Sequence, residues 1–451
     1  MNLNKQSVRS VFASVSRYIS VPENVRLRVE SFGGIAFDKL TGMLIELDRD
    51  AVTLLQYIHS AGAVAEDAVI THFEDQDCVA GVLERLFDLG IIHIAAPHAL
   101  SIDKNFSSTA QPISRPSGPR LTAPETVHWA ITYRCDQHCP DCYARRYSSD
   151  FTNELDTGVA MRLVNILANW GVFQLAIGGG EPLLWPDLAE ICRHAHQNGM
   201  VVHVTTGYHD VNKELLHSLA ESISVLQIGV KHNKLLENPH IEYSKLSNTI
   251  EIARNLGISI GVNLMLSRTV LAHFNELIDI LARAGVDRIT LLRYKPTADQ
   301  RQWVSENPSP DVWSGFEQQL RNTISRCSGI IFRVDCALSF LQRNLNSDTA
   351  AALGMCGCVA GRRILALVPD GSAYSCSQLI RSDLRVGNLL MDDPDDLWAL
   401  SDSLRICRTF RGSQEYNRSR CGICGARSHC GGCRAFAADW LDGDPGCPVS
   451  I

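Results

Sequence analysis

The sequence predicts an α/β protein in which a parallel sheet lies between a small N-terminal domain and a cysteine-rich C-terminal domain. Three observations support this class. Short strand-like apolar runs alternate with helical stretches over residues 127–296. A segment rich in Ser, Pro and Thr, residues 99–126, reads as a linker after the first 98 residues. The 16 cysteines of the 451-residue chain are concentrated in one short loop and after residue 355.

Composition and charge describe an ordinary globular chain. Hydrophobic residues make up 45% and charged residues 20% of the sequence. The net charge of -7 argues against a nucleic-acid binder held by its overall field. No apolar run approaches the roughly 18 residues that a membrane span needs, and the N-terminus lacks the apolar core of a signal peptide. We therefore expect a cytoplasmic protein whose cysteines bind metal rather than form disulfides.

Residues 1–98 are predicted to form a winged-helix-like α+β domain. Its elements, in order, are strand-like runs at Val25–Val29, Gly34–Phe37 and Met43–Leu47, a helix capped by Asp48 or Asp50, a helix near Ala65–Phe73, and a helix from Val79 to Phe87 that ends at Gly90 before a returning strand. Residues 1–100 contain eight Lys and Arg and thirteen Asp and Glu, a balance of -5. Because an acidic face repels phosphate, DNA is not the expected ligand.

The central region, residues 127–296, is predicted to contain parallel strands joined by helices, since strands alternating with helical segments indicate βαβ units. The candidate strands are residues 127–132, 173–177, 201–205, 225–230, 258–264 and 287–292. Residues 297–355 have mixed periodicity and read as bridging helices, and residues 356–451 form the cysteine-rich domain.

The first strand of this region leads into the loop CDQHCPDC, which places Cys135, Cys139 and Cys142 in a CxxxCxxC spacing. Three thiolates on one short loop can hold three corners of an iron-sulfur cubane and leave the fourth iron open. The alternative is a zinc site completed by His138. Structural zinc sites usually combine two separated Cys/His pairs, however, and none falls at that spacing here.

This loop, together with the GGGEP run at residues 178–182 behind the apolar stretch FQLAI, resembles the radical S-adenosylmethionine (radical SAM) enzymes. The resemblance implies a partial (βα)6 barrel with a [4Fe-4S] cluster on the three cysteines, at the C-terminal ends of the strands. It also implies that Gly179, Gly180 and Glu181 hold the methionine amino group of SAM.

Other cofactor contacts follow the family pattern unevenly. Thr206 stands in a Thr-Thr-Gly where relatives often have TNG, and Asn263 and Arg293 lie near the ends of the fifth and sixth strands, where they could contact cofactor or substrate. The QIGVK at residues 227–231 replaces QISLD, so a serine that commonly reaches the ribose is missing and Lys231 replaces an aspartate. Lys231 is either a solvated strand-end lysine or a functional group. Asp141, before the third cysteine, stands where the family usually has an aromatic residue.

The C-terminal cysteines resemble a SPASM domain, with GSAYSC ending at Cys376 and CGICGARSHCGGC ending at Cys433. The resemblance implies two auxiliary iron-sulfur clusters of the 4Fe-4S type. One is held by Cys421, Cys424, Cys430 and Cys447, and the other by Cys376 and Cys433 with Cys356 and/or Cys358. Cys336 is either a core thiol or a ligand, and Cys78, Cys192, Cys327 and Cys407 are predicted to be packing residues. A zinc ribbon is the alternative, but five residues between the two CxxC pairs are too few for its hairpin.

The N-terminal stretch from Phe32 to Ile58 resembles the peptide-recognition domain of peptide-modifying systems, in which a leader peptide adds as an edge strand. The combined resemblances imply a maturase that cleaves SAM reductively, with electrons from a donor such as flavodoxin or ferredoxin, and oxidatively crosslinks or cyclises a ribosomally made precursor peptide. A purely structural N-terminal domain is the alternative for that unit. For the whole chain the alternatives are a haem or haem d1 biosynthetic enzyme and, from another class, a metal- or redox-sensing DNA-binding regulator.

Overall fold

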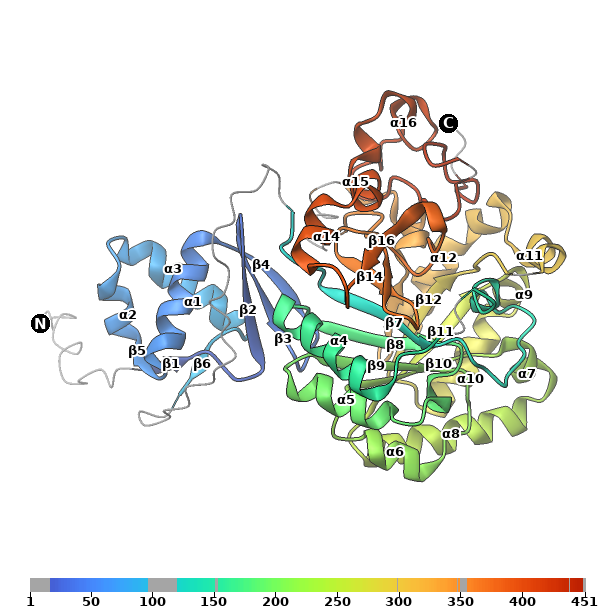
Figure 1. Ribbon diagram of the computed structural model, residues 1–451, viewed down its shortest axis with the longest axis horizontal. Coiled ribbons are helices and arrows are strands. Elements are labelled where there is room, and N and C mark those ends of the chain that lie inside the picture. Colours follow the sequence, from blue (N-terminus) through green and yellow to red (C-terminus); the bar gives the residue numbers. More distant parts are fainter. Residues whose placement is uncertain are drawn as a thin grey trace, which may run out of the picture. The chain divides into compact units, whose positions relative to one another are not determined.

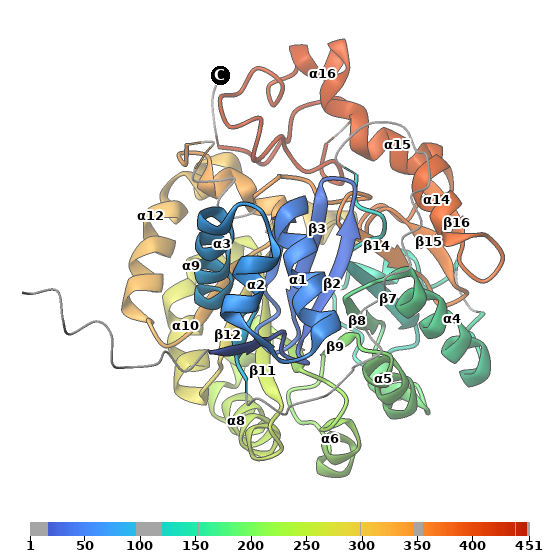
Figure 2. The same cartoon turned by 90° about the vertical axis from the view of Figure 1, so that its left-hand side faces the viewer.

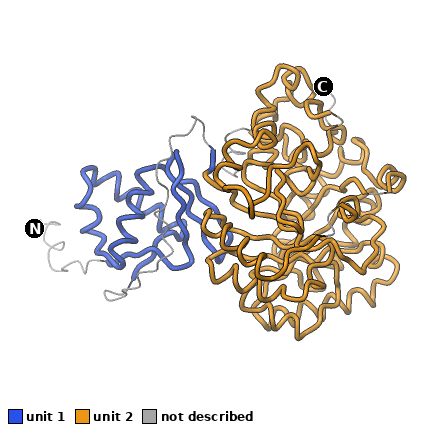
Figure 3. Tube along the Cα trace, viewed as in Figure 1, with its two compact units in different colours: residues 1–121 blue, residues 122–451 orange. Residues whose placement is uncertain are grey.

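The computed structural model describes residues 17–95, 120–150, 153–297, 299–346, 348, 355–437 and 439–448. The chain divides into two compact units, residues 1–121 and 122–451 (Figure 3). Of the predicted linker, residues 99–126, the first part up to residue 119 lies outside the described residues. No helix of the described ranges is both long and apolar enough to cross a bilayer.

The first unit contains small strands and helices in the predicted order. Its elements are β1 (Tyr18–Ser20), β2 (Val25–Glu30), β3 (Gly33–Asp38), β4 (Leu44–Asp48), α1 (Arg49–Ala61), β5 (Val64–Ala65), α2 (Glu66–His72), α3 (Gln76–Asp88) and β6 (His93–Ile94) (Figure 1). One antiparallel sheet has the order β2-β3-β4 and another the order β5-β1-β6. Asp48 caps α1, because its carboxylate accepts a hydrogen bond from the Ala51 N–H. Leu55 and Ile58 of α1 are buried in the core of this unit.

The described residues of the second unit form a ten-stranded sheet with the order β13-β12-β11-β10-β9-β8-β7-β14-β15-β16. Its central strands are β7 (Thr126–Thr132), β8 (Gln174–Gly179), β9 (Val201–Thr206), β10 (Val225–Gly229), β11 (Ser259–Leu266) and β12 (Arg288–Arg293). Each pairs in parallel with its neighbours. All six predicted strands of this region are therefore confirmed, and they form a partial barrel.

Helices connect and cover these strands. They are α4 (Thr157–Trp170), α5 (Leu188–Gln197), α6 (Lys213–Leu219), α7 (His232–Glu237), α8 (Pro239–Asn255), α9 (Arg268–Ala272) and α10 (Phe274–Ala284), with the 3-10 turns η1 (Ala144–Arg146) and η2 (Pro182–Leu184). Figure 2 shows α4, α5, α6, α8 and α10 in an arc outside the strands. The inward faces of these helices and the alternate residues of the strands form one continuous apolar core.

The region predicted to consist of bridging helices contains a strand as well. Besides α11 (Gln300–Glu306) and α12 (Pro310–Arg326), it forms β13 (Ile331–Val334) and the 3-10 segment η3 (Cys336–Gln342). β13 pairs in parallel with β12, from Arg288↔Ile331 to Leu291↔Val334. The prediction of helix was wrong for these four residues, because Ile, Phe and Val suit a strand and the open edge of β12 supplies their backbone partners.

The cysteine-rich region begins inside the same sheet. β14 (Ile364–Leu367) pairs in parallel with β7, and β15 (Ser372–Tyr374) and β16 (Arg385–Asn388) continue antiparallel from it. The remaining elements are η4 (Ser382–Leu384), α14 (Pro394–Leu400), α15 (Asp402–Thr409), η5 (Phe410–Gly412) and α16 (Gln414–Arg418). The C-terminal cysteines are thereby attached to the barrel sheet by backbone hydrogen bonds.

Candidate active site

The cysteine loop leaves the C-terminal end of β7 through a network of side chains that fixes its first residues. Thr132 Oγ1 hydrogen-bonds to Glu154, and the Arg134 guanidinium forms two hydrogen bonds with the same carboxylate, of 3.0 and 2.8 Å. Because β7, β8 and β9 are parallel neighbours, the segments that follow them emerge at one edge of the sheet. This edge brings together the cysteine loop, the glycine run after β8 and the Thr-Gly pair after β9.

Two glycines at the end of β8 allow that strand to approach the start of the cysteine loop. Gly180 N–H donates to Thr132 O at 2.7 Å, and Glu181 N–H donates to Arg134 O at 2.8 Å. A Cβ on Gly179 would lie 2.1 Å from Thr132 O, and one on Gly180 would lie 2.3 Å from Arg134 O. Glycine is therefore required here by contact with the protein's own backbone, a reason that the sequence pattern did not reveal.

Glu181 is fully buried behind this edge, and uncharged groups donate hydrogen bonds to its carboxylate. The donors are Thr206 Oγ1 at 2.9 Å, Gly207 N–H at 2.9 Å and Leu183 N–H at 3.2 Å. Burial raises the pKa of Glu181, and these hydrogen bonds oppose that rise. A ligand ammonium group would supply the positive charge that these three donors lack, so the residue fits the amino-group role expected from the motif.

The three thiols of the loop lie within electrostatic reach of one another. Burial raises the pKa of Cys135 and of Cys139, and the negative charge of Cys142 contributes to both shifts. The loop is held by Tyr208, whose hydroxyl donates to Asp136 Oδ2 at 2.8 Å, and by Lys231, whose ammonium group donates to Gln137 Oε1. His138 takes a left-handed conformation with φ of 46°, which lets the chain turn sharply between the first two cysteines.

Polar side chains of the neighbouring strands β10, β11 and β12 hydrogen-bond to one another. Gln227 Nε2 donates to Asn263 Oδ1 at 2.8 Å and to Thr290 Oγ1 at 3.1 Å, so the predicted cofactor ligand Asn263 is already engaged by its neighbour on β10. Burial lowers the pKa of His128 and of His203 to about 4, which keeps both imidazoles neutral at neutral pH.

Four thiols from distant segments, Cys336, Cys358, Cys376 and Cys433, form a first C-terminal group, because the charge of Cys358 acts on each of the other three. Burial raises the pKa of Cys336 well above its usual value, and the charges of Cys358, Cys433 and Cys376 raise it further. Burial likewise raises the pKa of Cys376 to about 12, with a contribution from Cys358. Cys356 instead offers its backbone carbonyl to Arg411 at 3.1 Å.

The second C-terminal group lines a cavity. Cys421, Cys424, Cys430 and Cys447, the four cysteines expected to act together, all lie on its wall. Burial raises the pKa of Cys430 to about 12, and the charges of Cys447 and Cys421 add to the shift. Among the residues that the structure describes, no three His, Cys, Asp or Glu side chains converge closely enough to hold a single metal ion.

The isolated cysteines differ in their surroundings. Cys192 packs in the barrel core and Cys407 in a smaller buried cluster that also contains Cys358 and Cys376, Cys327 is partly buried, and Cys78 is exposed. The prediction was wrong for Cys78, because α3 turns Leu83 and Leu86 toward the core and leaves its first turn in solvent.

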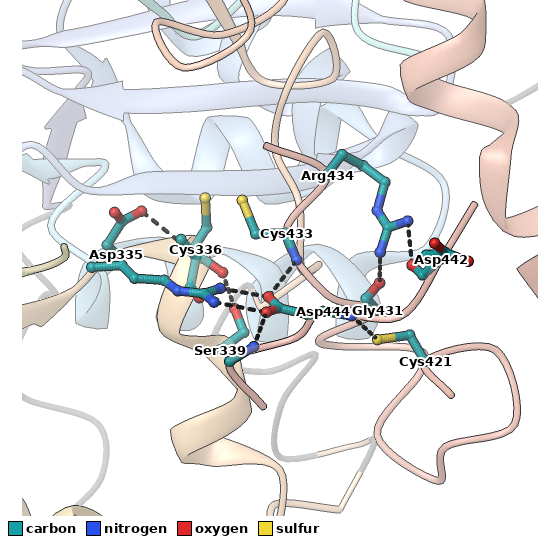
Figure 4. Close-up of polar contacts among 12 residues, drawn as sticks. Asp335, Cys336, Ser339, Cys421, Gly431, Cys433, Arg434, Asp442 and Asp444 are labelled. Atoms are coloured by element: carbon teal, nitrogen blue, oxygen red, sulfur yellow. Dashed lines mark hydrogen bonds and ion pairs between the residues drawn. The ribbon is translucent and has the colours of Figure 1, made fainter. Parts of the chain in front are cut away.

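Asp444 connects the two C-terminal groups, and sequence reasoning missed it (Figure 4). Its carboxylate forms two hydrogen bonds with Arg293, of 2.6 and 2.8 Å, and accepts from the N–H of Cys433 at 3.1 Å. Its own N–H donates to Cys421 Sγ at 3.3 Å. Arg293, predicted to face the cofactor, is 1% exposed and also lies 3.8 Å above the Phe436 ring. Its burial is a property of the fold, and a buried arginine needs a carboxylate partner.

The structure places a three-thiol loop and a buried glutamate together at the C-terminal edge of the strands of a partial parallel barrel. Residues 129–275 match the Radical SAM superfamily.

Relatives match a longer part of the chain. Mycofactocin maturase MftC of Mycobacterium tuberculosis is 26% identical over 343 residues, 72% of this chain and 83% of that protein. AdoMet-dependent heme synthase of Methanosarcina barkeri is 24% identical over 345 residues, 72% of this chain and 96% of that protein. The structure of Streptococcus suis SuiB bound to precursor peptide SuiA matches with a TM-score of 0.71 and 17% identity, covering 96% of this chain and 100% of that one. This last likeness concerns the fold alone.

Proposed function

We propose that this chain is a radical SAM maturase that oxidatively modifies a ribosomally made precursor peptide. The observation that carries the proposal is the three-thiol loop at the same strand edge as buried Glu181, in a chain whose fold resembles that of SuiB bound to its precursor peptide SuiA over 96% of its length. When bound, the cluster and SAM supply a 5'-deoxyadenosyl radical for hydrogen abstraction. The chain's own residues bind the methionyl end through Glu181, orient the cysteine loop through Arg134 and Tyr208, and exclude water.

The C-terminal thiols are proposed to hold two auxiliary iron-sulfur clusters. For the first cluster, burial raises the pKa of Cys336, Cys376 and Cys433 and the charge of Cys358 raises it further, which supports these four thiols and makes Cys336 a ligand rather than a core thiol. For the second, the shared cavity supports Cys421, Cys424, Cys430 and Cys447. Thiolates select iron-sulfur clusters over hard metal ions, and each group offers four.

The N-terminal unit is proposed to be a winged-helix-like domain that binds the leader of the precursor. In its larger sheet, β2 and β4 are the edge strands, to which an extended peptide can add through main-chain hydrogen bonds. The exposed side chains of Leu40 and Met43, just before β4, offer apolar contact beside that edge. A leader of complementary charge would be basic, because the unit's balance is negative.

The second candidate is tetrapyrrole chemistry, since a relative of similar identity is named a heme synthase. That relative aligns with 72% of this chain, whereas the peptide-bound neighbour covers 96% of it. The additional coverage extends into the N-terminal unit, which favours a substrate large enough to need a separate binding domain.

The function is tested by anaerobic reconstitution with iron and sulfide, followed by reduction and addition of SAM. We expect iron near three cubanes per chain and release of 5'-deoxyadenosine, which Cys139→Ala abolishes. A precursor peptide that is a substrate should lose two hydrogens per crosslink in mass spectrometry, and a version without its leader should bind more weakly. Turnover of iron-coproporphyrin instead of the peptide would overturn the peptide assignment. Zinc without nucleoside release would overturn the enzyme assignment.

The ligand set is tested by comparing cysteine variants in the same preparation. Cys336→Ala is expected to lower the iron content by up to one cubane and to change the Mössbauer spectrum, because one of four ligands is lost. Cys192→Ala is the matched control, since Cys192 is a buried thiol of the barrel core. Unchanged iron and spectrum in Cys336→Ala would return Cys336 to the role of a core thiol.

A further inference from the structure

Lys231 follows β10 at the edge of the sheet that carries the cysteine loop, where it replaces an acidic residue of the related pattern. It is half-buried, and its backbone N–H donates to His209 Nε2 at 3.2 Å. His209 Nδ1 in turn contacts Glu242 at 2.7 Å. The lysine is thus fixed at its backbone, and its side chain reaches over to the cysteine loop, where the ammonium group donates to Gln137 Oε1.

The groups around Gly207 show which side chains lie near Lys231. A Cβ built on Gly207 would lie 3.5 Å from Glu181 Oε2, 3.9 Å from Lys231 Cε and 3.9 Å from Gln137 Cγ. A carboxylate and a lysine stem therefore border the same small space, with the cysteine loop as a third side. Burial lowers the pKa of Lys231, and the charges of Cys139, Cys135 and Glu181 oppose that shift, which agrees with this geometry.

We propose that Lys231 binds the carboxylate of the methionyl end of SAM. This inference rests on the proposed function, in which Glu181 takes the ammonium group of that ligand. An α-amino acid carries its ammonium and its carboxylate on one carbon, so a site that pairs the first with a carboxylate is completed by a cation next to it. Lys231 supplies that cation. The amide oxygen of Gln137 is a weaker, neutral acceptor that a ligand carboxylate can displace.

Arg134, the cation that follows β7 in the cysteine loop, is already paired. The Arg134 guanidinium is held by two hydrogen bonds to Glu154, and its backbone carbonyl is held by Glu181. The competing role for Lys231 is to fix Gln137 and nothing else. The two roles predict different effects on binding affinity when the carboxylate is removed from the ligand.

The test measures equilibrium binding of two ligands to the reconstituted holoenzyme, by anaerobic calorimetry and by the change in the EPR signal of the reduced cluster. The ligands are SAM and decarboxylated SAM, which retains the amine and the sulfonium but lacks the carboxylate. Lys231→Met is expected to weaken SAM binding by about 10- to 100-fold while changing the affinity for decarboxylated SAM by less than about threefold. Lys231→Arg keeps the cation and should retain most of the preference for SAM.

Lys234→Met is the matched control, because Lys234 is an exposed lysine of α7 one turn away. It should leave both affinities unchanged. Lys231→Gln, which keeps a donor toward Gln137, replaces the Met variant if the latter loads less iron. Equal weakening of both ligands in the neutral variants, or no weakening of either, would overturn the inference while leaving the proposed function intact. A wild-type holoenzyme that binds neither ligand would overturn the proposed function as well.

Discussion

Replacing Asp444 with Asn is expected to destabilise the second unit by about 3–5 kcal/mol, the usual cost of leaving one member of a buried ion pair without its partner. Asp444 and Arg293 are nearly inaccessible, with 1% and 2% of their side-chain surfaces exposed. The carboxylate accepts two hydrogen bonds from Arg293 and one each from the N–H groups of Cys433 and Gly446. An amide of the same size offers one oxygen to these donors and turns an NH2 group toward the rest.

The free energy of unfolding is measured by urea titration of the iron-free chain, so that loss of a cluster does not enter the result. Asp402→Asn is the matched control, because Asp402 pairs with Arg405 at 2.7 Å but is 81% exposed. An exposed pair of this kind contributes less than about 1 kcal/mol. The double variant Arg293→Met with Asp444→Leu should recover much of the lost stability, since it leaves no buried charge. Equal effects of Asp444→Asn and Asp402→Asn would refute the reasoning.

Other properties follow from single residues. The free energy of unfolding should fall as the pH is lowered from about 6.5 toward 4. The reason is that His128 and His203 become protonated in the unfolded chain but stay neutral in the folded chain, where each pKa is near 4. His128→Gln should weaken this pH dependence in urea titrations at pH 7 and 5. Gly180→Ala should abolish 5'-deoxyadenosine formation, since its Cβ would meet Arg134 O, and retained activity would show that the strand end can move. Gly315→Ala, in open space on α12, should stabilise the chain by about 0.4–1 kcal/mol by urea titration, and destabilisation would contradict this.

The strands of the barrel could be predicted because local composition and periodicity determine them. The six central strands are buried runs of Val, Ile and Leu between helices, and the structure has each within two residues of its predicted bounds. β13 was missed for the opposite reason. Ile331–Val334 is short and exposed on alternate residues, and what makes it a strand is the free edge of β12, a partner that local sequence does not reveal.

The site was predictable where residue spacing carries the chemistry and unpredictable where a distant partner decides. Spacing placed Cys135, Cys139 and Glu181 together, because each lies just beyond the end of a parallel strand. The role of Arg293 depended on Asp444, 151 residues further along the chain. Its position at a strand end alone suggested that the arginine contacts the cofactor. Only the fold shows that its guanidinium group is already hydrogen-bonded to a carboxylate.

This pairing also bears on how the C-terminal thiols are positioned for chemistry. Two members of the first thiol group follow strands of the barrel sheet directly, Cys336 after β13 and Cys376 after β15, and a third, Cys433, donates its N–H to Asp444. Sheet hydrogen bonds and a buried ion pair therefore constrain these residues even before a cluster binds them. A group held in this way loses little conformational freedom on metal binding, so the proposed first auxiliary cluster should assemble on a largely preformed site. Loss of the Arg293–Asp444 pair should accordingly weaken iron retention at that site before it affects the three-thiol loop at the other strand ends.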